Sequence, residues 1–295
     1  MDMMKKEEQL FLSLKDRLPF NLEYVDYDND IFTLSNNNRN YYLYKLNDRK
    51  YKIIYSLGKS KFILKPIFTF KDNDIYLLYE EVINKSSSKS LSLDALKAYK
   101  KIYNEFSFKT ELNKLEASIL QNLFKVLDSR FTGLEFRIRE LELKPKKNDL
   151  DWIILSKYHV ILDARIYLFD LETDIFKMVD KKESMEYGLI FKDSNLNLYK
   201  NGLVMPKIDV YYGPIASMLA RYFIINNLYI SDDEFKNEFN DLSIFNKRYF
   251  LFLSLYICIL NINIEFYVNN TVVQKYLSYT NLISRIIKKY GEFAK

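Results

Sequence analysis

Two aspartates with an asparagine between them are the residues of this 295-residue chain whose types and spacing point to chemistry. Asp193 follows an apolar segment that we expect to be a strand, residues 187–191, and Asp209 follows another, residues 203–208. Carboxylate oxygens bind Mg²⁺, and the side-chain oxygen of an asparagine such as Asn197 can complete the set of ligands. The pattern predicts a metal and phosphate site at the ends of two neighbouring strands.

A purely structural role for the same residues stays open. Asp and Asn favour turns because their side chains hydrogen-bond to the nearby backbone, and Asp193 and Asn195 fit that role as well. Asp209 precedes Gly213 and Pro214, so it is equally suited to cap the segment that follows. The sole histidine, His159, precedes three apolar residues, so we expect it to be packed or hydrogen-bonded rather than to act as a base.

The composition is that of a folded globular protein, with 48% hydrophobic and 28% charged residues. The net charge of +5 is dispersed along the chain, whereas nucleic-acid binders concentrate their basic residues on one face. Nucleic acid is therefore not the expected partner, although a basic protein that binds nucleic acid or another anionic surface through its lysines stays open as an alternative. The densest basic positions are Lys97, Lys100, Lys101, Lys144, Lys146, Lys147, Lys288 and Lys289.

One cysteine, Cys258, excludes a disulfide within the chain and favours a reducing compartment. It lies in an apolar run, residues 249–260, that is too short to span a bilayer. Residues 1–8 carry charges of both signs and lack the apolar stretch of a signal peptide. We expect a cytoplasmic protein without a membrane span.

The segments divide into a β-rich part and a helical part, an α+β layout with two lobes. Residues 1–84 form the expected N-lobe, residues 85–92 a serine-containing linker or hinge, and residues 93–295 a helical C-lobe with a β-hairpin near 187–210. Strands are predicted at 41–46, 61–70 and 75–83, residues 48–57 fit either a helix or a strand, and late helices are predicted at 215–228, 232–242, 247–260 and 272–290.

Two apolar stripes with helical spacing are expected to face the core of the C-lobe. The first consists of Leu112, Leu115, Ile119, Leu123 and Val126, and the second of Trp152, Leu155, Val160, Leu162 and Ile166.

This order of segments resembles the protein-kinase-like fold, and more narrowly the aminoglycoside phosphotransferase and choline kinase branch. Within that branch the chain is most similar to the kinase-like proteins of bacterial spore coats. Residues 41–46 resemble the strand that bears the phosphate-positioning lysine, and residues 75–82 the strand that enters the hinge. Residues 156–167, the hairpin and residues 213–221 resemble the large lobe.

The resemblance assigns roles to five residues. Lys45 would pair with the phosphates of a nucleotide, and Glu81 would lie at the hinge that binds its base. Asp193 would be the base that accepts the proton of the substrate hydroxyl, while Asn197 and Asp209 would hold the metal. The implied cofactors are ATP and Mg²⁺.

Departures from the family pattern predict that the chemistry is reduced or lost. Phe191 stands where the catalytic loop of the family has histidine, and Asn197 comes one residue too early after Asp193. No glycine precedes Gly58, so no glycine-rich loop can approach phosphates. Met218 replaces the aspartate of the next helix.

The resulting hypothesis is a catalytically degenerate kinase-like protein that acts as a scaffold or binding module. Its partners would be other proteins in an assembly such as a spore coat. The alternative is an active ATP- and Mg²⁺-dependent phosphotransferase acting on a small molecule.

Overall fold

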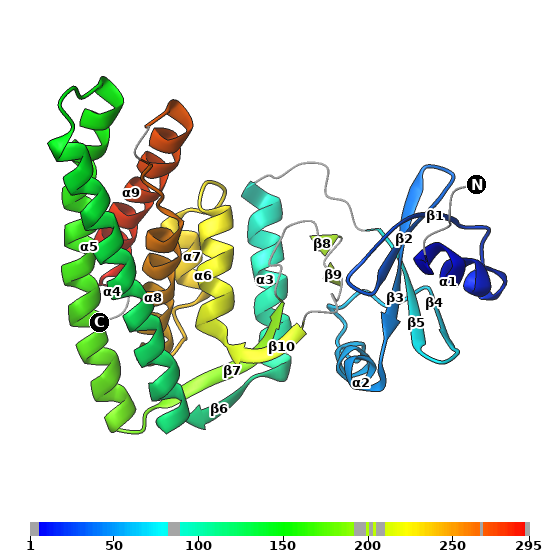
Figure 1. Cartoon of the computed structure of the whole chain (residues 1–295). Coiled ribbons are helices and arrows are strands. Elements are labelled where there is room, and N and C mark those ends of the chain that lie inside the picture. The colour runs from blue at the N-terminus through cyan, green and yellow to red at the C-terminus, as the bar shows by residue number, and fades with distance from the viewer. Residues whose placement is uncertain are drawn as a thin grey trace. The chain divides into compact units, whose positions relative to one another are not determined.

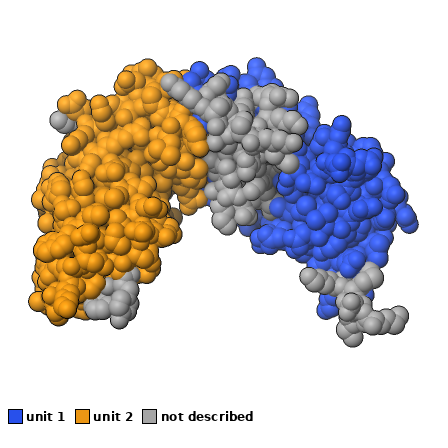
Figure 2. All heavy atoms as spheres, turned by 90° about the horizontal axis from the view of Figure 1, so that it is seen from above, with its two compact units in different colours: residues 1–105, 191–211 blue, residues 106–190, 212–295 orange. Residues whose placement is uncertain are grey.

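The computed structural model describes residues 6–81, 89–191, 199–200, 203–204, 210–265 and 268–292. The chain forms two compact units, coloured separately in Figure 2. The first consists of residues 1–105 and 191–211, and the second of residues 106–190 and 212–295. The lobe boundaries expected from the sequence, at residues 84 and 93, stay a prediction.

A five-stranded antiparallel sheet is the centre of the first unit (Figure 1). Its order is β1-β2-β3-β5-β4, with β1 at Glu23–Asp28, β2 at Ile31–Asn36, β3 at Arg39–Leu46, β4 at Phe68–Lys71 and β5 at Ile75–Glu80. The predicted strands at 41–46 and 75–83 are confirmed in type, whereas only the end of the predicted strand at 61–70 is a strand. The ambiguous segment is a helix, α2 (Asp48–Leu57), which begins where the side chain of Asn47 accepts a hydrogen bond from the Lys50 amide.

A helix packs on each face of this sheet, and the inner strand β5 is buried on both faces. Phe11 and Leu14 of helix α1 (Lys6–Leu14) pack on one face and Ile54 of α2 packs on the other. Since successive residues of a strand point to opposite faces, β3 and β5 divide their side chains between the two cores. The α1 side holds Phe32, Leu34, Tyr41, Leu43, Tyr76 and Leu78, and the α2 side holds Tyr44, Leu46, Ile75, Leu77 and Tyr79.

The first unit also contains a helix and a short hairpin from later in the chain. Helix α3 (Lys89–Phe106) begins inside the predicted linker, the first half of which lies outside the described residues. Strands β8 (Tyr199–Lys200) and β9 (Leu203–Val204) pair with each other. Val204 also bonds to the segment after α2, because its amide donates to the Phe62 carbonyl at 2.7 Å and its carbonyl accepts from the Leu64 amide at 2.9 Å.

The second unit is mainly helical, and all four late helices predicted from the sequence are present. It contains α4 (Lys114–Leu143), α5 (Asp149–Asp180), α6 (Ile215–Asn226), α7 (Asp232–Glu238), α8 (Ile244–Asn261) and α9 (Asn270–Tyr290). A three-stranded sheet of order β10-β7-β6 is formed by β6 (Phe108–Glu111), β7 (Ser184–Phe191) and β10 (Val210–Pro214). None of the helices in the described part of the chain is both long and apolar enough to cross a membrane.

The first predicted core stripe is wrong by about one residue. Leu115, Ile119 and Val126 are 65%, 47% and 48% exposed. The buried stripe of α4 consists of Leu120, Phe124, Leu127, Phe131, Leu134, Ile138 and Leu141. Leu112 is buried but precedes the helix, since α4 begins after its N-cap, Asn113. A helical spacing counted from Leu112 therefore falls about one residue before the buried stripe.

The second predicted stripe is wrong in three of its five positions. Val160 is buried, but Trp152 is 58%, Leu162 40% and Ile166 65% exposed. Helix α5 contacts α4, α8 and α9 through a different face. That face carries Ile154, Ile161, Ala164, Leu168, Leu171 and Ile175.

A buried carboxylate fixes the turn between α4 and α5. Asp151 is fully buried and accepts a hydrogen bond from the Asn148 amide at 2.9 Å, while the Asn148 side chain accepts from the Asp151 amide. The Nζ atom of Lys144 lies 2.9 Å from Oδ2 of Asp151 and compensates its charge. The reciprocal cap and the ion pair together determine where α5 begins.

Candidate functional site

Lys45, the predicted partner of nucleotide phosphates, lies on β3 and points to the α1 side of the sheet, as do Tyr41 and Leu43. Its Nζ atom lies 3.3 Å from Oδ2 of Asp74, and its amide donates to the Asp30 carbonyl at 2.8 Å. The side chain is about as exposed as that of its partner, at 29% and 34%. The ammonium group of Lys45 thus already forms an ion pair with Asp74 of the same unit.

Glu81, the predicted hinge residue, connects the end of β5 to β3. Its carboxylate accepts hydrogen bonds from Nδ2 of Asn40 and from the hydroxyl of Tyr42, both at 2.7 Å, and its amide donates to the Asn40 carbonyl at 2.9 Å. Desolvation, together with this hydrogen bond, raises the pKa of Tyr42 to about 12. These contacts hold the chain where β5 ends.

Asp193, Asn197 and Asp209 lie outside the described residues, so their roles stay predictions. The described neighbours are β7, which ends at Phe191, and β10, which begins at Val210. Within the described ranges no group of three or more His, Cys, Asp or Glu side chains is placed to hold a metal ion.

The turn between β1 and β2 is acidic and tight. Asn29 and Asp30 adopt left-handed backbone conformations, with φ of 50° and 65°. The carboxylate of Asp30 accepts a hydrogen bond from the Tyr27 hydroxyl at 3.2 Å and lies 3.3 Å from Nζ of Lys50. Asp28 accepts from the side chain of Asn29 at 2.9 Å. A two-residue hairpin turn of type I′ requires φ above zero at both central residues, and here Asn29 and Asp30 adopt these values in place of glycine. The turn therefore carries the carboxylates of Asp28 and Asp30 and contains no glycine.

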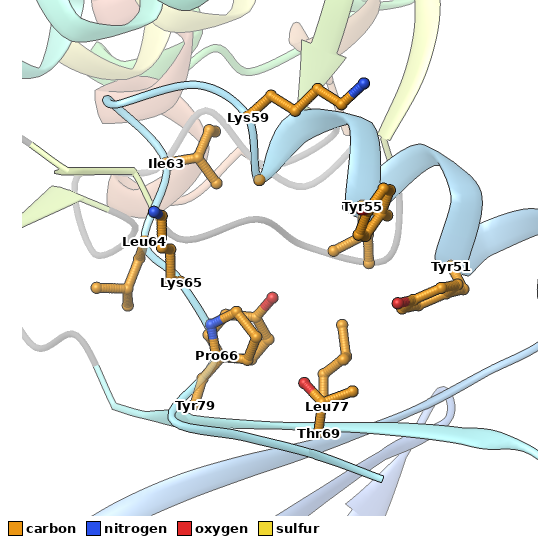
Figure 3. A pocket seen from close by; sticks show the side chains of 12 residues that line it. Tyr51, Tyr55, Lys59, Ile63, Leu64, Lys65, Pro66, Thr69, Leu77 and Tyr79 are labelled. Carbon is orange, nitrogen blue, oxygen red and sulfur yellow. The ribbon is translucent and has the colours of Figure 1, made fainter. Parts of the chain in front are cut away.

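A pocket of about 480 Å³ lies on the α2 side of the same sheet (Figure 3). Helix α2 and the segment that follows it form one wall, and β4 and β5 form the other. Its lining consists of Tyr51, Ile54, Tyr55, Gly58, Lys59, Ile63, Leu64, Lys65, Pro66, Thr69, Leu77 and Tyr79. Sequence reasoning missed this pocket. The available signal was the uninterrupted apolar run of β5, which indicates a strand buried on both faces.

Two further side chains of types that can do chemistry are those of His159 and Cys258. Nδ1 of His159 hydrogen-bonds to the Ser156 carbonyl at 3.0 Å within helix α5. Cys258 is fully buried in α8, and desolvation raises the pKa of its thiol to about 12. A thiol with so high a pKa is no nucleophile near neutral pH.

No protein-family model and no curated protein matches the sequence. Solved structures do match the fold. An aminoglycoside phosphotransferase from Alicyclobacillus acidocaldarius aligns with 99% of this chain and 96% of its own, with a TM-score of 0.60 and 11% identity. The GDP complex of wild-type aminoglycoside 2′-phosphotransferase-IIIa aligns with 98% of this chain and 99% of its own, with a TM-score of 0.50 and 9% identity. The chain therefore has the kinase-like α+β fold of the aminoglycoside phosphotransferases, as predicted.

Proposed function

We propose that this chain is a kinase-like protein that has lost phosphoryl transfer and acts as a binding module in a protein assembly. The observation that carries the proposal is the acidic β1–β2 turn. Protein kinases cover the phosphates of their nucleotide with a glycine-rich loop, whose backbone comes close to the phosphate oxygens. In this chain the first hairpin of the sheet presents Asp28 and Asp30 instead.

Carboxylates at that position oppose the binding of a triphosphate. Two like unit charges 4 Å apart repel each other by about 1 kcal/mol in water and by about 4 kcal/mol at an effective dielectric constant of 20. Lys50 compensates Asp30 in part, at 3.3 Å. Asp28 is exposed, and within the described part of the chain only the neutral side chain of Asn29 hydrogen-bonds to it.

The surroundings of Lys45 support the same proposal. Its ammonium group pairs with Asp74 and points to the α1 side of the sheet, where the core is apolar. A phosphate would have to compete with Asp74 for this charge. Because phosphoryl transfer depends on positioning and on charge stabilisation, the loss of such groups is costly for the rate.

The class of partner that we propose is another protein in an assembly, of the kind that the resemblance to spore-coat proteins implies. Dispersed charge supports a protein partner over nucleic acid. On this proposal Asp193, Asn197 and Asp209 are remnants of a metal site.

An active phosphotransferase is the alternative, and a specific observation favours it. One structure with the same fold was solved as a GDP complex. On this alternative the chain binds ATP or GTP with Mg²⁺ through Asp209 and Asn197, and Asp193 accepts the proton of the acceptor hydroxyl.

Thermal unfolding with and without nucleotide separates the two. A ligand present at 100 times its dissociation constant stabilises a protein by about 2.7 kcal/mol, which raises Tm by about 5–10 °C for a domain of 150–250 residues. We expect no rise for the wild type with either ATP or GTP and Mg²⁺, and no nucleotide turnover. Asp209→Ala tests the site, and Asp163→Ala, at an exposed position of α5, is the control. A rise that disappears only in Asp209→Ala would overturn the proposal.

A further inference from the structure

The pocket on the α2 side of the sheet has the properties of a site for a small molecule. Its volume, about 480 Å³, lies within the range of about 300–1,000 Å³ that ligand pockets occupy. Ile54 and Leu77 belong to the apolar core on this side, and Leu64 packs against it. Thus α2 and β5 supply an apolar wall on either side of the pocket (Figure 3).

One polar atom in this apolar lining lacks a partner. The side chain of Tyr79 is fully buried, and among the residues that the structure describes its hydroxyl has no hydrogen-bond partner. Figure 3 shows the Tyr79 side chain leaving β5 and pointing into the space between the sheet and the segment that holds Ile63 and Pro66. A buried hydroxyl without a partner is unfavourable, so the site is suited to a ligand that brings an acceptor.

The charges of the lining are all positive. Lys59 and Lys65 line the pocket, neither forms an ion pair with a described residue, and no carboxylate is among the lining residues. Both lysines are exposed, so they contribute a favourable potential at the mouth of the pocket rather than a buried contact. An anionic acceptor suits this arrangement better than a neutral one.

We propose that this pocket binds a small amphipathic anion, a monocarboxylate with an apolar chain or ring. The apolar part packs between Ile54 and Leu77, the carboxylate accepts the hydrogen of the Tyr79 hydroxyl, and Lys59 and Lys65 attract its charge. The site lies on the opposite face of the sheet from Lys45, and it goes beyond the binding role proposed above. Nucleotide binding does not enter its test.

Calorimetric titration of the full chain with decanoate, below the concentration at which it forms micelles, tests the site. We expect saturable binding of one decanoate per chain. Tyr79→Phe removes only the hydroxyl and weakens the binding about tenfold, as expected for a hydrogen bond to a charged group. Tyr76→Phe is the matched control, because Tyr76 is a buried tyrosine of the same strand on the other face of the sheet. We expect the affinity of this variant for decanoate to stay within twofold of that of the wild type.

A second variant, Lys59→Gln combined with Lys65→Gln, changes only exposed side chains and leaves the core intact. We expect it to weaken decanoate binding about threefold and to reduce the effect of salt on the affinity, since screening acts on exposed charges. Decanol, which lacks the charge, binds at least tenfold more weakly than decanoate. Absence of saturable binding, equal affinity for decanol, or an unchanged affinity in Tyr79→Phe would each overturn the proposal.

Discussion

The Nζ atom of Lys45 lies 3.3 Å from Oδ2 of Asp74, across the pair of strands β3 and β5. Lys45 is directly opposite Tyr76 in the register of the two strands, and Asp74 immediately precedes β5. The ion pair therefore connects the end of β3 to the start of β5 on the α1 side of the sheet. Tyr44, one residue earlier, belongs to the core on the α2 side.

Separating Lys45 from Asp74 should have a small effect on stability. Both side chains are about one-third exposed, and ion pairs of this kind contribute about 0.2–1 kcal/mol. We expect Lys45→Gln and Asp74→Asn each to lower the free energy of unfolding by less than about 1 kcal/mol, with a coupling energy of about 0.5 kcal/mol. Urea denaturation of the single and double variants measures this coupling. Fully additive effects of the two changes would show that the pair contributes nothing.

Tyr42 gives the first unit a dependence on alkaline pH. Its pKa of about 12 in the folded chain exceeds the ordinary value of about 10, because the folded state favours the neutral phenol. The stability that this shift contributes is fully present below pH 10 and is lost as the pH rises through 12. The variant Tyr42→Phe has no titrating hydroxyl, so it lacks both this contribution to stability and the hydrogen bond to Glu81.

We therefore expect the wild type to be more stable than Tyr42→Phe by a constant amount between about pH 7 and pH 9. The difference should narrow between about pH 10 and pH 12. Urea denaturation at a series of pH values, followed by circular dichroism, measures it. A difference that persists undiminished at about pH 12 would show that the phenol titrates normally in the folded chain.

Tyr79→Phe should stabilise the chain in the absence of ligand. A buried hydroxyl without a partner costs about 1–3 kcal/mol, and phenylalanine keeps the ring contact with Tyr44, whose centroid lies 5.1 Å away. We expect the free energy of unfolding to rise by about 1 kcal/mol. Tyr76→Phe should give no such gain. A loss of stability in Tyr79→Phe would mean that the hydroxyl is satisfied in the folded protein.

Two leucines of α4 test which of its faces is buried. Leu120 is 3% exposed and Leu115 is 65% exposed. Replacing a buried leucine by alanine costs about 2–5 kcal/mol, so Leu120→Ala should lose an amount in this range. Leu115→Ala should change the free energy of unfolding by less than about 0.5 kcal/mol. Chemical denaturation compares them directly, and similar losses would contradict the observed phase of the helix.

Asp151 should be essential to the turn between α4 and α5. Asp151→Asn keeps the size of the side chain but removes the charge that compensates Lys144, which is 18% exposed. Removing one partner of a fully buried ion pair costs about 3–5 kcal/mol, and the partial exposure of Lys144 lowers our expectation to about 2–3 kcal/mol. Asp149→Asn, at an exposed position of the same first turn, is the control and should have little effect on thermal unfolding.

Element types were largely predictable from local sequence, and the burial of helix faces was not. The strand at 41–46 and the late helices follow from apolar periodicity and β-branched or aromatic residues. In α4, however, apolar residues occur on more than one face. Ile119 and Leu120 are neighbours of similar hydrophobicity, and only their tertiary surroundings decide that Leu120 is buried. A single apolar stripe cannot be chosen without knowing where the helix begins.

The candidate site depends on contacts between distant residues, and the sequence did not predict them. Lys45 and Asp74 are 29 positions apart, and their pairing follows from the register of β3 with β5. The pocket also depends on contacts between distant residues, because Ile54 of α2 and Leu77 of β5 belong to the same core. The sequence left residues 48–57 open between a helix and a strand, so this contact could not be predicted. The absence of a glycine-rich loop could be predicted, because no glycine precedes Gly58 in the sequence.

The exposure of Trp152 on α5 limits how unfolding can be observed. It is the only tryptophan of the chain, it is 58% exposed, and Nζ of Lys147 lies 5.6 Å from the centre of its ring. An indole already in water emits at long wavelength before denaturation, so its fluorescence maximum shifts little when the chain unfolds. Because Trp152 belongs to the second unit, its emission does not report directly on the five-stranded sheet. Melting of that sheet can pass unnoticed by intrinsic tryptophan emission, and a fluorophore attached within it would make the transition visible.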